Sequence, residues 1–400
     1  MAGLDLSAFD AVLKDIFLGP IRVNLNQGTI LMSRLDKTAD FIVAGGKKVI
    51  SPLLYGHSQA VGARADNQAL PAVKKSKYKE SQTTVKHNYG RIYVTGPTIR
   101  ASKTEASAFA KAVESEMKNM VAGLKRDINR QLIVGDGNGK LAQIDSFAGL
   151  VITVKNPGGV TTTTDATMFC AEDMDIDIYS SDLSVKRGSA TITSVDEAAG
   201  TVTIDADPGM ANDDWILRKG VKGEEMMGLR GIVDDGTVVQ TLQGIDSSTS
   251  KWWRAKRLHN NGVLRDVTPR LLQQGYSAVE KQGLTPTLGI TSFDIRDSYA
   301  NQLTNTRQLV NTRVLEFGFE AIVYNNKPIV PDDQCPTSIL FWLVESLLAI
   351  HRQSDFDWAD EDGHILTKVS GYDAYEAFMY YDAELGTFRR NAHCVIQDLQ

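Results

Sequence analysis

Cysteine is scarce in this 400-residue chain, and its placement excludes two common ways of holding a fold together. The three cysteines, Cys170, Cys335 and Cys394, lie far apart and form no C-x-x-C pair. An odd number of cysteines without that spacing argues against a disulfide framework and against structural zinc. We therefore expect a chain that folds in a reducing cytosol, without a metal ion or another cofactor.

The residue patterns of common catalytic sites are also missing. None of the six histidines pairs with another at H-x-H or H-x-x-x-H spacing, and no G-x-S-x-G sequence occurs. These absences exclude the usual zinc-binding helix motif and the nucleophile elbow of hydrolases. Residues distant in sequence can still converge in a fold, but our prediction is that the protein is not an enzyme.

Long apolar runs are absent as well. The longest, from Ile339 to Ile350, is interrupted by Glu345 and is too short to cross a bilayer. The first residues, Met-Ala-Gly-Leu-Asp, lack the basic and apolar regions of a signal peptide. We therefore expect no membrane partner and no secretion through a recognisable signal.

The composition is that of a folded protein with more than one domain. Hydrophobic residues make up 42% of the chain, which suffices for the cores of two or three domains. The net charge is −6 and the isoelectric point is near 5.6, so the chain as a whole is a poor candidate for non-specific nucleic-acid binding.

The strongest single pattern is a long amphipathic helix from Ser102 to Val134. Ser102 and Glu105 have the spacing of a capping box, and apolar residues then recur at three- and four-residue steps. At 1.5 Å per residue this helix is roughly 50 Å long, about the width of a domain. We expect Gly135 to end it in the left-handed conformation that helix ends favour.

The segment before this helix, Tyr55 to Thr98, is too polar and too basic to form a core. Strands Thr83 to His87 and Arg91 to Thr95, on either side of Asn88-Tyr-Gly90, are predicted to pair as the base of a long hairpin. A loop of this length is unusual inside one compact domain, so we expect a projecting element that needs a partner. Seven basic residues against two acidic ones give the segment a local charge of +5. The basic residues are Arg64, Lys74, Lys75, Lys77, Lys79, Lys86 and Arg91.

The stretch from Asp332 to Asp362 is acidic, with a local charge of −7. It ends in an acidic segment, which we interpret as a solvated turn that docks on the basic segment of another copy by charge. The alternative interpretation of this segment is a calcium site. The spacing of its carboxylates, however, does not match the calcium loop of an EF-hand. The candidate contact residues are Asp355, Asp357, Asp360, Glu361 and Asp362.

The remaining segments give the chain an α+β pattern. Leu4 to Phe17 reads as a short amphipathic helix at the start of an extended arm. Residues 150–240 are rich in Thr, Gly and Asp and read as an inserted β module, with Ile192, Val202 and Ile204 turned inward. Helices are predicted at Arg270 to Lys281 and Ser292 to Asn301, strands at Phe319 to Tyr324 and Pro328 to Val330, and a strand-rich segment at Tyr372 to Asp398.

Two further motifs have competing interpretations. Gly135-Asp-Gly-Asn-Gly-Lys140 resembles a phosphate loop, but it follows a helix instead of a strand, so a structural turn is favoured. Trp252-Trp253, flanked by Lys and Arg, could stack on single-stranded nucleic acid or pack at a domain junction; we favour packing. The Lys-rich hairpin could bind phosphates, but a protein partner is favoured because the rest of the chain is acidic.

In combination, these segments resemble the major capsid proteins of tailed bacteriophages. Each matching stretch is weak alone, but their order extends over most of the chain. The stretches are Asn88-Tyr-Gly-Arg-Ile-Tyr-Val-Thr-Gly96, Arg126-Asp-Ile-Asn-Arg-Gln-Leu132, Met227-Gly-Leu-Arg-Gly-Ile-Val-Asp-Asp-Gly236, Pro328-Ile-Val-Pro-Asp-Asp-Gln-Cys-Pro336, Ser354-Asp-Phe-Asp-Trp358 and Arg389-Arg-Asn-Ala-His393.

The resemblance implies the α+β Hong Kong 97-like capsid fold, in which a spine helix crosses a peripheral domain and an axial domain gathers copies around symmetry axes. On this expectation the chain divides into an N-terminal arm (1–54), an E-loop hairpin (55–98), a peripheral domain (99–149) with its spine helix (102–134), an inserted β-rich module (150–240), a mainly axial region with some peripheral strands (241–385), and a C-terminal return to the peripheral domain (386–400).

The implied function is self-assembly through hexamers and pentamers into an icosahedral shell around double-stranded DNA. The implied locations are the virion capsid and, during assembly, the host cytoplasm. Only about fifty residues precede the E-loop, so we expect a separate scaffolding protein, besides a portal and a decoration protein. No Lys–Asn crosslink between subunits is expected, since no partner matches Lys74, Lys75 or Lys77. The alternatives are a polyanion-binding protein that uses the Lys-rich hairpin and an encapsulin-like compartment.

Overall fold

The computed structural model describes residues 30–35, 40–42, 48–97, 106–305, 312–314, 320–360 and 365–400. The predicted N-terminal helix, the capping residues Ser102 and Glu105, and the candidate contacts Glu361 and Asp362 lie outside these residues. Within them, no helix has the length and apolar character needed to cross a membrane. The three cysteines are free, as predicted.

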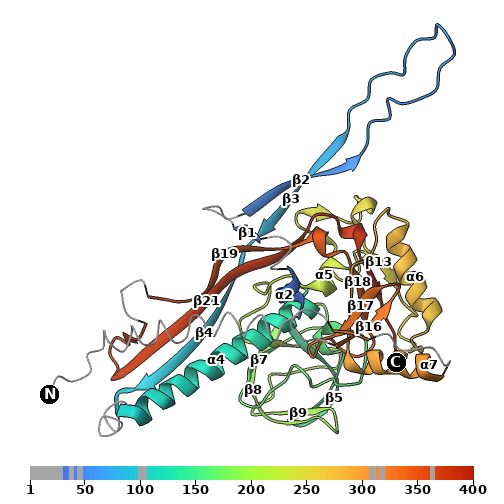
Figure 1. Cartoon of the computed structure of the whole chain (residues 1–400). Coiled ribbons are helices and arrows are strands. Elements are labelled where there is room, and N and C mark those ends of the chain that lie inside the picture. Colours follow the sequence, from blue (N-terminus) through green and yellow to red (C-terminus); the bar gives the residue numbers. More distant parts are fainter. Residues whose placement is uncertain are drawn as a thin grey trace.

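The long helix is present as α4 (Ala106–Val134), and it runs along one face of a five-stranded sheet (Figure 1). In strand β4 (Lys86–Thr95), Asn88 and Ile92 point to the buried side, while Tyr89 and Tyr93 alternate with them and are exposed. α2 (Ile30–Leu35) adds a second helix against α4. The other strands of the sheet are β1 (Asp40–Ile42), β19 (Leu348–Trp358), β20 (Thr367–Lys368) and β21 (Ala374–Thr387).

The projecting hairpin exists, but its strands are not the predicted ones. β2 (Lys48–Gly56) pairs with β3 (Lys77–Thr84) in antiparallel register, whereas β4 pairs along its whole length with β21. The predicted turn at Asn88-Tyr-Gly90 is therefore wrong. A side chain at Gly90 would place its Cβ 2.3 Å from Met120 Sδ, so this glycine lets the helix approach the strand.

The inserted module is a closed antiparallel barrel of six strands, and it starts at Lys140, before the predicted boundary. Ile192, Val202 and Ile204 are buried inside it, as predicted. The strand order around the barrel is β10 (Trp215–Arg218), β5 (Lys140–Ala148), β6 (Val151–Lys155), β9 (Thr201–Ile204), β8 (Lys186–Asp196) and β7 (Asp175–Tyr179).

A second, seven-stranded sheet lies mostly within the region predicted to be axial, and helices α6 (Pro269–Glu280) and α7 (Phe293–Asn305) pack on one of its faces; this sheet and its two helices are called the axial region below. In its strand β18, Leu340 and Trp342 point to these helices and Phe341 and Leu343 point into the main core. The strand order is β13 (Lys256–Leu258), β22 (Cys394–Ile396), β18 (Leu340–Leu343), β14 (Leu288–Thr291), β17 (Lys327–Pro331), β16 (Glu320–Tyr324) and β15 (Thr312–Val314).

The end of the chain corrects one prediction. β22 lies between β13 and β18 in the seven-stranded sheet, so residues 386–400 do not return to the sheet beside α4. Cys394, Val395 and Ile396 are all buried there. An apolar strand of three residues pairs equally well in either sheet, and the sequence pattern alone does not distinguish the two.

The C-terminal end of α4 depends on close backbone contact with α5 (Leu229–Ile232). Gly228 N donates to Gly135 O at 3.0 Å, and a Cβ at Gly228 would lie 2.0 Å from Gln131 O. Gly135 does not have the predicted left-handed φ; its Cβ would lie 2.3 Å from Gln131 O. Both glycines are thus required by close approach.

Replacing Gly123 with alanine is expected to stabilise the subunit by about 0.5 to 1 kcal/mol. Gly123 lies on the exposed side of α4, and no atom is within 4 Å of the position that a Cβ would take. Gly135→Ala is the matched control and should destabilise, because its Cβ meets backbone. Thermal unfolding of the two variants measures both effects, and equal stabilisation by both would contradict the prediction.

Candidate assembly surfaces

The base of the projecting hairpin is fixed to the body by a platform, residues 240–253. Tyr55 stacks on Trp252 with ring centroids 5.0 Å apart and planes 10° apart. Gln82 N donates to Gln243 O at 2.9 Å, and Gln243 Nε2 donates to Thr83 Oγ1 at 2.7 Å. The prediction that the tryptophan pair packs at a junction is confirmed, since Trp253 is buried beside Trp252.

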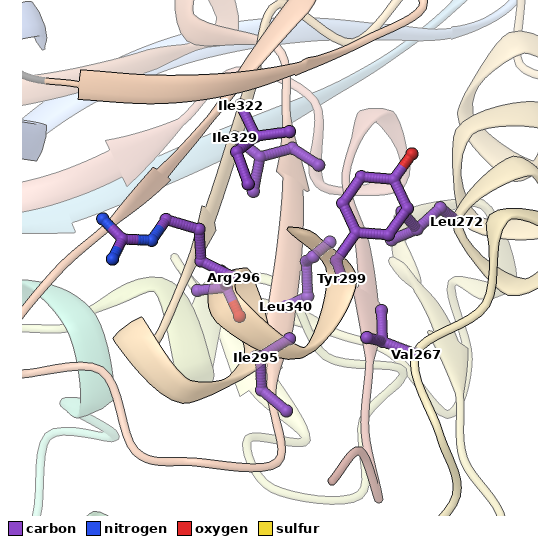
Figure 2. A pocket seen from close by; sticks show the side chains of 9 residues that line it. Val267, Leu272, Ile295, Arg296, Tyr299, Ile322, Ile329 and Leu340 are labelled. Carbon is purple, nitrogen blue, oxygen red and sulfur yellow. The ribbon is translucent and has the colours of Figure 1, made fainter. Parts of the chain in front are cut away.

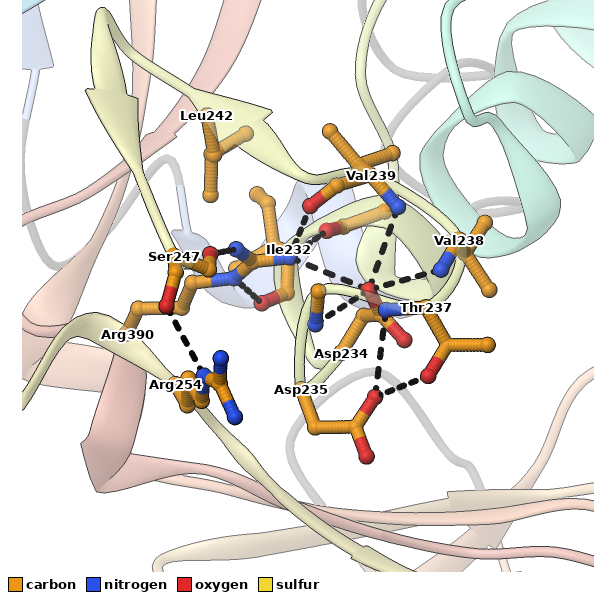
Figure 3. A network of polar contacts seen from close by, with 12 residues as sticks. Ile232, Asp234, Asp235, Thr237, Val238, Val239, Leu242, Ser247, Arg254 and Arg390 are labelled. Carbon is orange, nitrogen blue, oxygen red and sulfur yellow. Dashed lines mark hydrogen bonds and ion pairs between the residues drawn. The ribbon is translucent and has the colours of Figure 1, made fainter. Parts of the chain in front are cut away.

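A buried arginine, Arg390, supports this platform through hydrogen bonds. The Arg390 guanidinium donates to the carbonyl oxygens of Ile232, Gly231 and Val239 at 2.9 to 3.0 Å and to Ser247 Oγ at 2.7 Å (Figure 3). Asp234 lies 3.4 Å away and receives three backbone N–H groups of its own loop. Burial lowers the pKa of Arg390 to about 10, although Asp234 and Asp235 counteract this.

The outer part of the hairpin, residues 57–76, exposes apolar side chains. Val61, Leu70 and Val73 are 79%, 85% and 92% exposed. The tip is ordered only by local contacts, such as Arg64 Nε donating to Ala69 O at 2.9 Å. These three side chains therefore leave apolar surface exposed on the isolated subunit.

The predicted basic contact residues divide into two groups. Lys79 donates to Ser250 Oγ at 2.9 Å, Lys86 lies 3.6 Å from Glu224, and Arg91 pairs with Glu376, so these three serve contacts within the subunit. Arg64 orders the hairpin tip, as described above. Lys74, Lys75 and Lys77 are exposed and form no ion pair with any described residue.

The structure describes Asp355, Asp357 and Asp360 of the predicted acidic contact residues, and these three do not lie in one turn. Asp355 and Asp357 lie on strand β19, and each accepts a hydrogen bond from the next backbone N–H at 2.9 Å. Asp360 follows the strand and is half-buried. Upstream in the same acidic stretch, Asp332 is buried, and the buried Glu345 pairs with Arg34 at 2.5 Å. The interpretation of the stretch as a single docking surface is therefore not supported by its placement.

Sequence reasoning missed the face of the five-stranded sheet that lies away from α4. Tyr89 and Tyr93 of β4 and Phe378 of β21 are exposed on the side away from α4. The pairs His87–Asp382, at 2.7 Å, and Arg91–Glu376 lie on the same face. Tyr89 and Tyr93 are an even number of residues apart in β4, which was the available signal, but the predicted turn at Gly90 obscured it.

Ion pairs join the end of α4 to the barrel and to the segment that follows the barrel. Arg130 of α4 pairs with Glu225 and lies 3.1 Å from Asp127, and Arg218 of β10 lies 3.4 Å from Asp127. Burial by itself would raise the pKa of the Asp127 carboxyl. The nearby cations of Arg130 and Arg218 outweigh burial and lower this pKa below its usual value. These contacts fix the barrel at the spine helix.

A polar hollow of about 260 Å³ lies where the barrel, α4 and the axial region meet. Asp332 lines it and accepts from Asn129 Nδ2 and Gln334 N, both at 2.9 Å. Burial raises the pKa of Asp332 to about 7. No group of three His, Cys, Asp or Glu residues in the described part of the chain is arranged to hold a metal ion.

The axial region has two further depressions. One, between α7 and the sheet, is lined by Leu272, Ile295, Tyr299 and other side chains and has no room for a water molecule (Figure 2). The other is an open groove of about 770 Å³ along α6, with Lys256, Arg270 and Lys281 in its lining. The first is a packing gap and not a ligand pocket.

No family model matches the sequence, and no curated protein matches it. Solved structures are similar to it. The capsid asymmetric unit of cyanophage A-1(L) has a TM-score of 0.57 and 14% identity over 93% of each chain. The capsid of a native GTA particle has a TM-score of 0.48 and 8% identity over 92% of this chain and 90% of that one. The holo-SrpI encapsulin complex from Synechococcus elongatus PCC 7942 has a TM-score of 0.47 and 9% identity over 92% and 87%.

At 14% identity, the likeness to the cyanophage capsid concerns the fold. It extends over 93% of each chain. The chain therefore has the α+β Hong Kong 97-like fold of phage capsid proteins.

Proposed function

We propose that this chain is a structural major capsid protein, which self-assembles through hexamers and pentamers into an icosahedral shell enclosing double-stranded phage DNA. The observation that carries the proposal is the hairpin 48–84, whose exposed Val61, Leu70 and Val73 have no core of their own. In a shell these side chains are buried on a neighbouring copy. Obligate interfaces of this kind bury on the order of thousands of Å².

If the copies are related by closed point-group symmetry, repeated contacts of this kind would produce a closed shell. The proposed partners are further copies of the chain, a separate scaffolding protein, a portal and a decoration protein. Contact with the packaged DNA would be by proximity and without sequence preference. The proposed locations are the virion capsid and, during assembly, the host cytoplasm.

Electron microscopy and light scattering of the purified chain test this proposal directly. The expected result is that the purified chain forms closed particles, and that particles formed together with the other head proteins of the virus contain DNA. Discrete monomers at high concentration that bind DNA tightly and in a salt-dependent way would overturn it in favour of a polyanion-binding protein. Particles that hold a cargo protein would indicate an encapsulin-like compartment.

Reversing Lys74, Lys75 and Lys77 to Glu is expected to raise the protein concentration needed for assembly by at least about tenfold, since each copy loses contacts worth about 1.4 kcal/mol or more. These lysines are exposed and make no ion pair with a described residue of their own subunit, so the subunit should stay folded. Lys79 is left unchanged because it holds the hairpin base.

The matched control replaces the same three lysines with Arg, which keeps the charge and should assemble normally. Light scattering against protein concentration gives the threshold, and circular dichroism reports folding. Normal assembly of the Glu variant would contradict a docking role for these lysines.

A further inference from the structure

One stretch of the axial region is strongly basic, although the chain as a whole is acidic. Residues 251–283 contain seven Lys and Arg residues against two Asp and Glu residues, a net charge of +5 in a chain with a net charge of −6. The stretch comprises η3 (Lys251–Trp253), β13, α6 and the turn after α6. A partner that meets this surface therefore meets positive charge. The seven cations are Lys251, Arg254, Lys256, Arg257, Arg265, Arg270 and Lys281.

The seven cations differ in whether they already serve their own subunit. Arg254, Arg257 and Arg265 each donate a hydrogen bond to an oxygen atom elsewhere in the subunit, at 2.6 to 3.1 Å. Three of the others are exposed, form no ion pair with any described residue, and line the open groove along α6. These three are Lys256, Arg270 and Lys281.

The groove has a volume of about 770 Å³, and one face of α6 forms its long side. Arg270, Gln274, Ser277 and Lys281 follow one another at four-, three- and four-residue steps, so their side chains lie along the same face of the helix. At 1.5 Å per residue, Arg270 and Lys281 are separated by roughly 16 Å along the helix axis. The groove is therefore extended, with a cation at each end.

The lining of the groove combines cations with neutral hydrogen-bonding groups. β13, the edge strand of the sheet, contributes Lys256 and Leu258, which are two residues apart and thus lie on the same side of the strand. Glu280 of α6 is exposed but does not line the groove, and no other Asp or Glu is among the described residues that do. The neutral polar residues of the lining are Gln273, Gln274, Ser277 and Gln282.

We propose that this groove binds the phosphate backbone of nucleic acid, without sequence preference. Protein–protein interfaces depend on buried aromatic or large apolar anchors, but only Leu258 and Ala278 are apolar among the described residues of this lining. Phosphates need only cations and neutral donors. Along one strand of a duplex they recur every 3.4 Å or so of the axis, so the distance between Arg270 and Lys281 corresponds to about five phosphates. Because the inference rests on the proposed function, the nucleic acid is the packaged double-stranded DNA.

Fluorescence anisotropy of a short labelled DNA duplex, titrated with the unassembled subunit at several salt concentrations, tests the groove. Three phosphate contacts predict weak binding, in which log affinity falls against log salt concentration with a slope of about −2.7. Replacing the three groove cations together (Lys256→Gln, Arg270→Gln and Lys281→Gln) should lower the affinity at low salt by at least about tenfold and flatten this slope, because the phosphates lose their partners.

The matched control makes the same change at Lys74, Lys75 and Lys77 of the hairpin, which removes equal charge from another exposed surface. This control should bind the duplex as the wild-type subunit does, and circular dichroism reports the folding of both variants. Unchanged binding by the groove variant would overturn the proposal. Equal losses in both variants would also overturn it, since binding would then follow net charge.

The reactivity of Lys256 and Lys281 toward a small amine reagent, read by mass spectrometry, tests the groove in unmodified particles. Both lysines should react less in DNA-filled particles than in empty ones. Equal reactivity in the two would overturn the assignment to packaged DNA, and low reactivity in both, compared with the unassembled subunit, would place a second copy in the groove instead. Failure to form particles would refute the proposed function, while the anisotropy measurement would still decide whether the groove binds nucleic acid.

Discussion

Replacing Arg390 with methionine is expected to lower the free energy of unfolding by about 3 to 5 kcal/mol, because it removes one member of a buried polar network. The Arg390 side chain is fully buried and gives hydrogen bonds to three carbonyl oxygens and to Ser247. Methionine has a similar length but no donor. The carbonyl groups and the buried Asp234 carboxylate would then be left without the charge that offsets their burial.

The neighbouring Arg389 provides the matched control. Arg389 is only half-buried; it donates to Gln282 O at 2.8 Å and to Asn391 Oδ1 at 3.0 Å. Arg389→Met should cost about 1 kcal/mol, as expected for ordinary hydrogen bonds. Denaturant unfolding of the unassembled subunit gives both values. Similar costs for the two substitutions would contradict a special role for Arg390.

The Arg390 substitution should also loosen the hairpin. Asp234 and Ser247 belong to the loops that support Gln243, and Gln243 holds β3 by two hydrogen bonds. Hydrogen exchange is expected to increase in residues 240–253 and in β3 before it increases in β18. The unfolding measurement and the exchange measurement thus test the stability and the hairpin anchoring separately.

The sequence predicted the elements that depend on local pattern. The period of the apolar residues predicted the described part of α4 and placed its end at Val134. Ile192, Val202 and Ile204 alternate with polar residues, and this pattern correctly predicted that their side chains are buried in the barrel. These patterns depend only on residues close together in the sequence, and tertiary contacts with other elements did not change the secondary structure that they predict.

Predictions that depended on which strands pair were less successful. Gly90 looked like a turn residue because glycine often marks turns, but here it makes room for Met120 of α4. The pairing of β22 with β13 and β18 joins strands that are more than one hundred and more than fifty residues apart, respectively, and no local pattern encodes it. The barrel closes for the same reason: β10 completes it by pairing with both β5 and β7.

The candidate surfaces were predicted in part. The basic hairpin was found from composition, but whether a lysine serves its own subunit or a partner depends on distant neighbours such as Ser250 and Glu224.

Replacing Glu384 with glutamine is expected to stabilise the subunit at high pH and to have little effect at low pH. Glu384 of β21 is buried, and its Oε1 accepts a hydrogen bond from Met227 N at 2.6 Å. Burial raises the pKa of Glu384 to about 8, despite the opposing effects of the Met227 N–H and of Lys86. Glutamine keeps the acceptor and carries no charge at any pH.

The direction of this pH effect on stability follows from the number of protons that the carboxyl binds in the folded and unfolded states. A carboxyl with a pKa near 4.5 in the unfolded chain and about 8 in the folded one binds more protons when folded between these values. Its contribution to stability is therefore fully present below about pH 4.5 and is lost as the pH rises through about 8. Ionisation at pH 9 should cost the wild-type subunit on the order of 4 kcal/mol, and Glu384→Gln removes this cost.

Denaturant unfolding of wild type and Glu384→Gln at pH 5 and pH 9 measures the difference. Other titrating groups, such as Asp332 and His393, are present in both proteins and cancel in the comparison. Glu376→Gln is the matched control on the same strand, because Glu376 is half-exposed and pairs with Arg91, so its effect should be within about 1 kcal/mol at both pH values. Equal effects of Glu384→Gln at the two pH values would mean that Glu384 ionises in the folded subunit without cost, and the buried carboxyl would then have no part in the pH dependence of its stability.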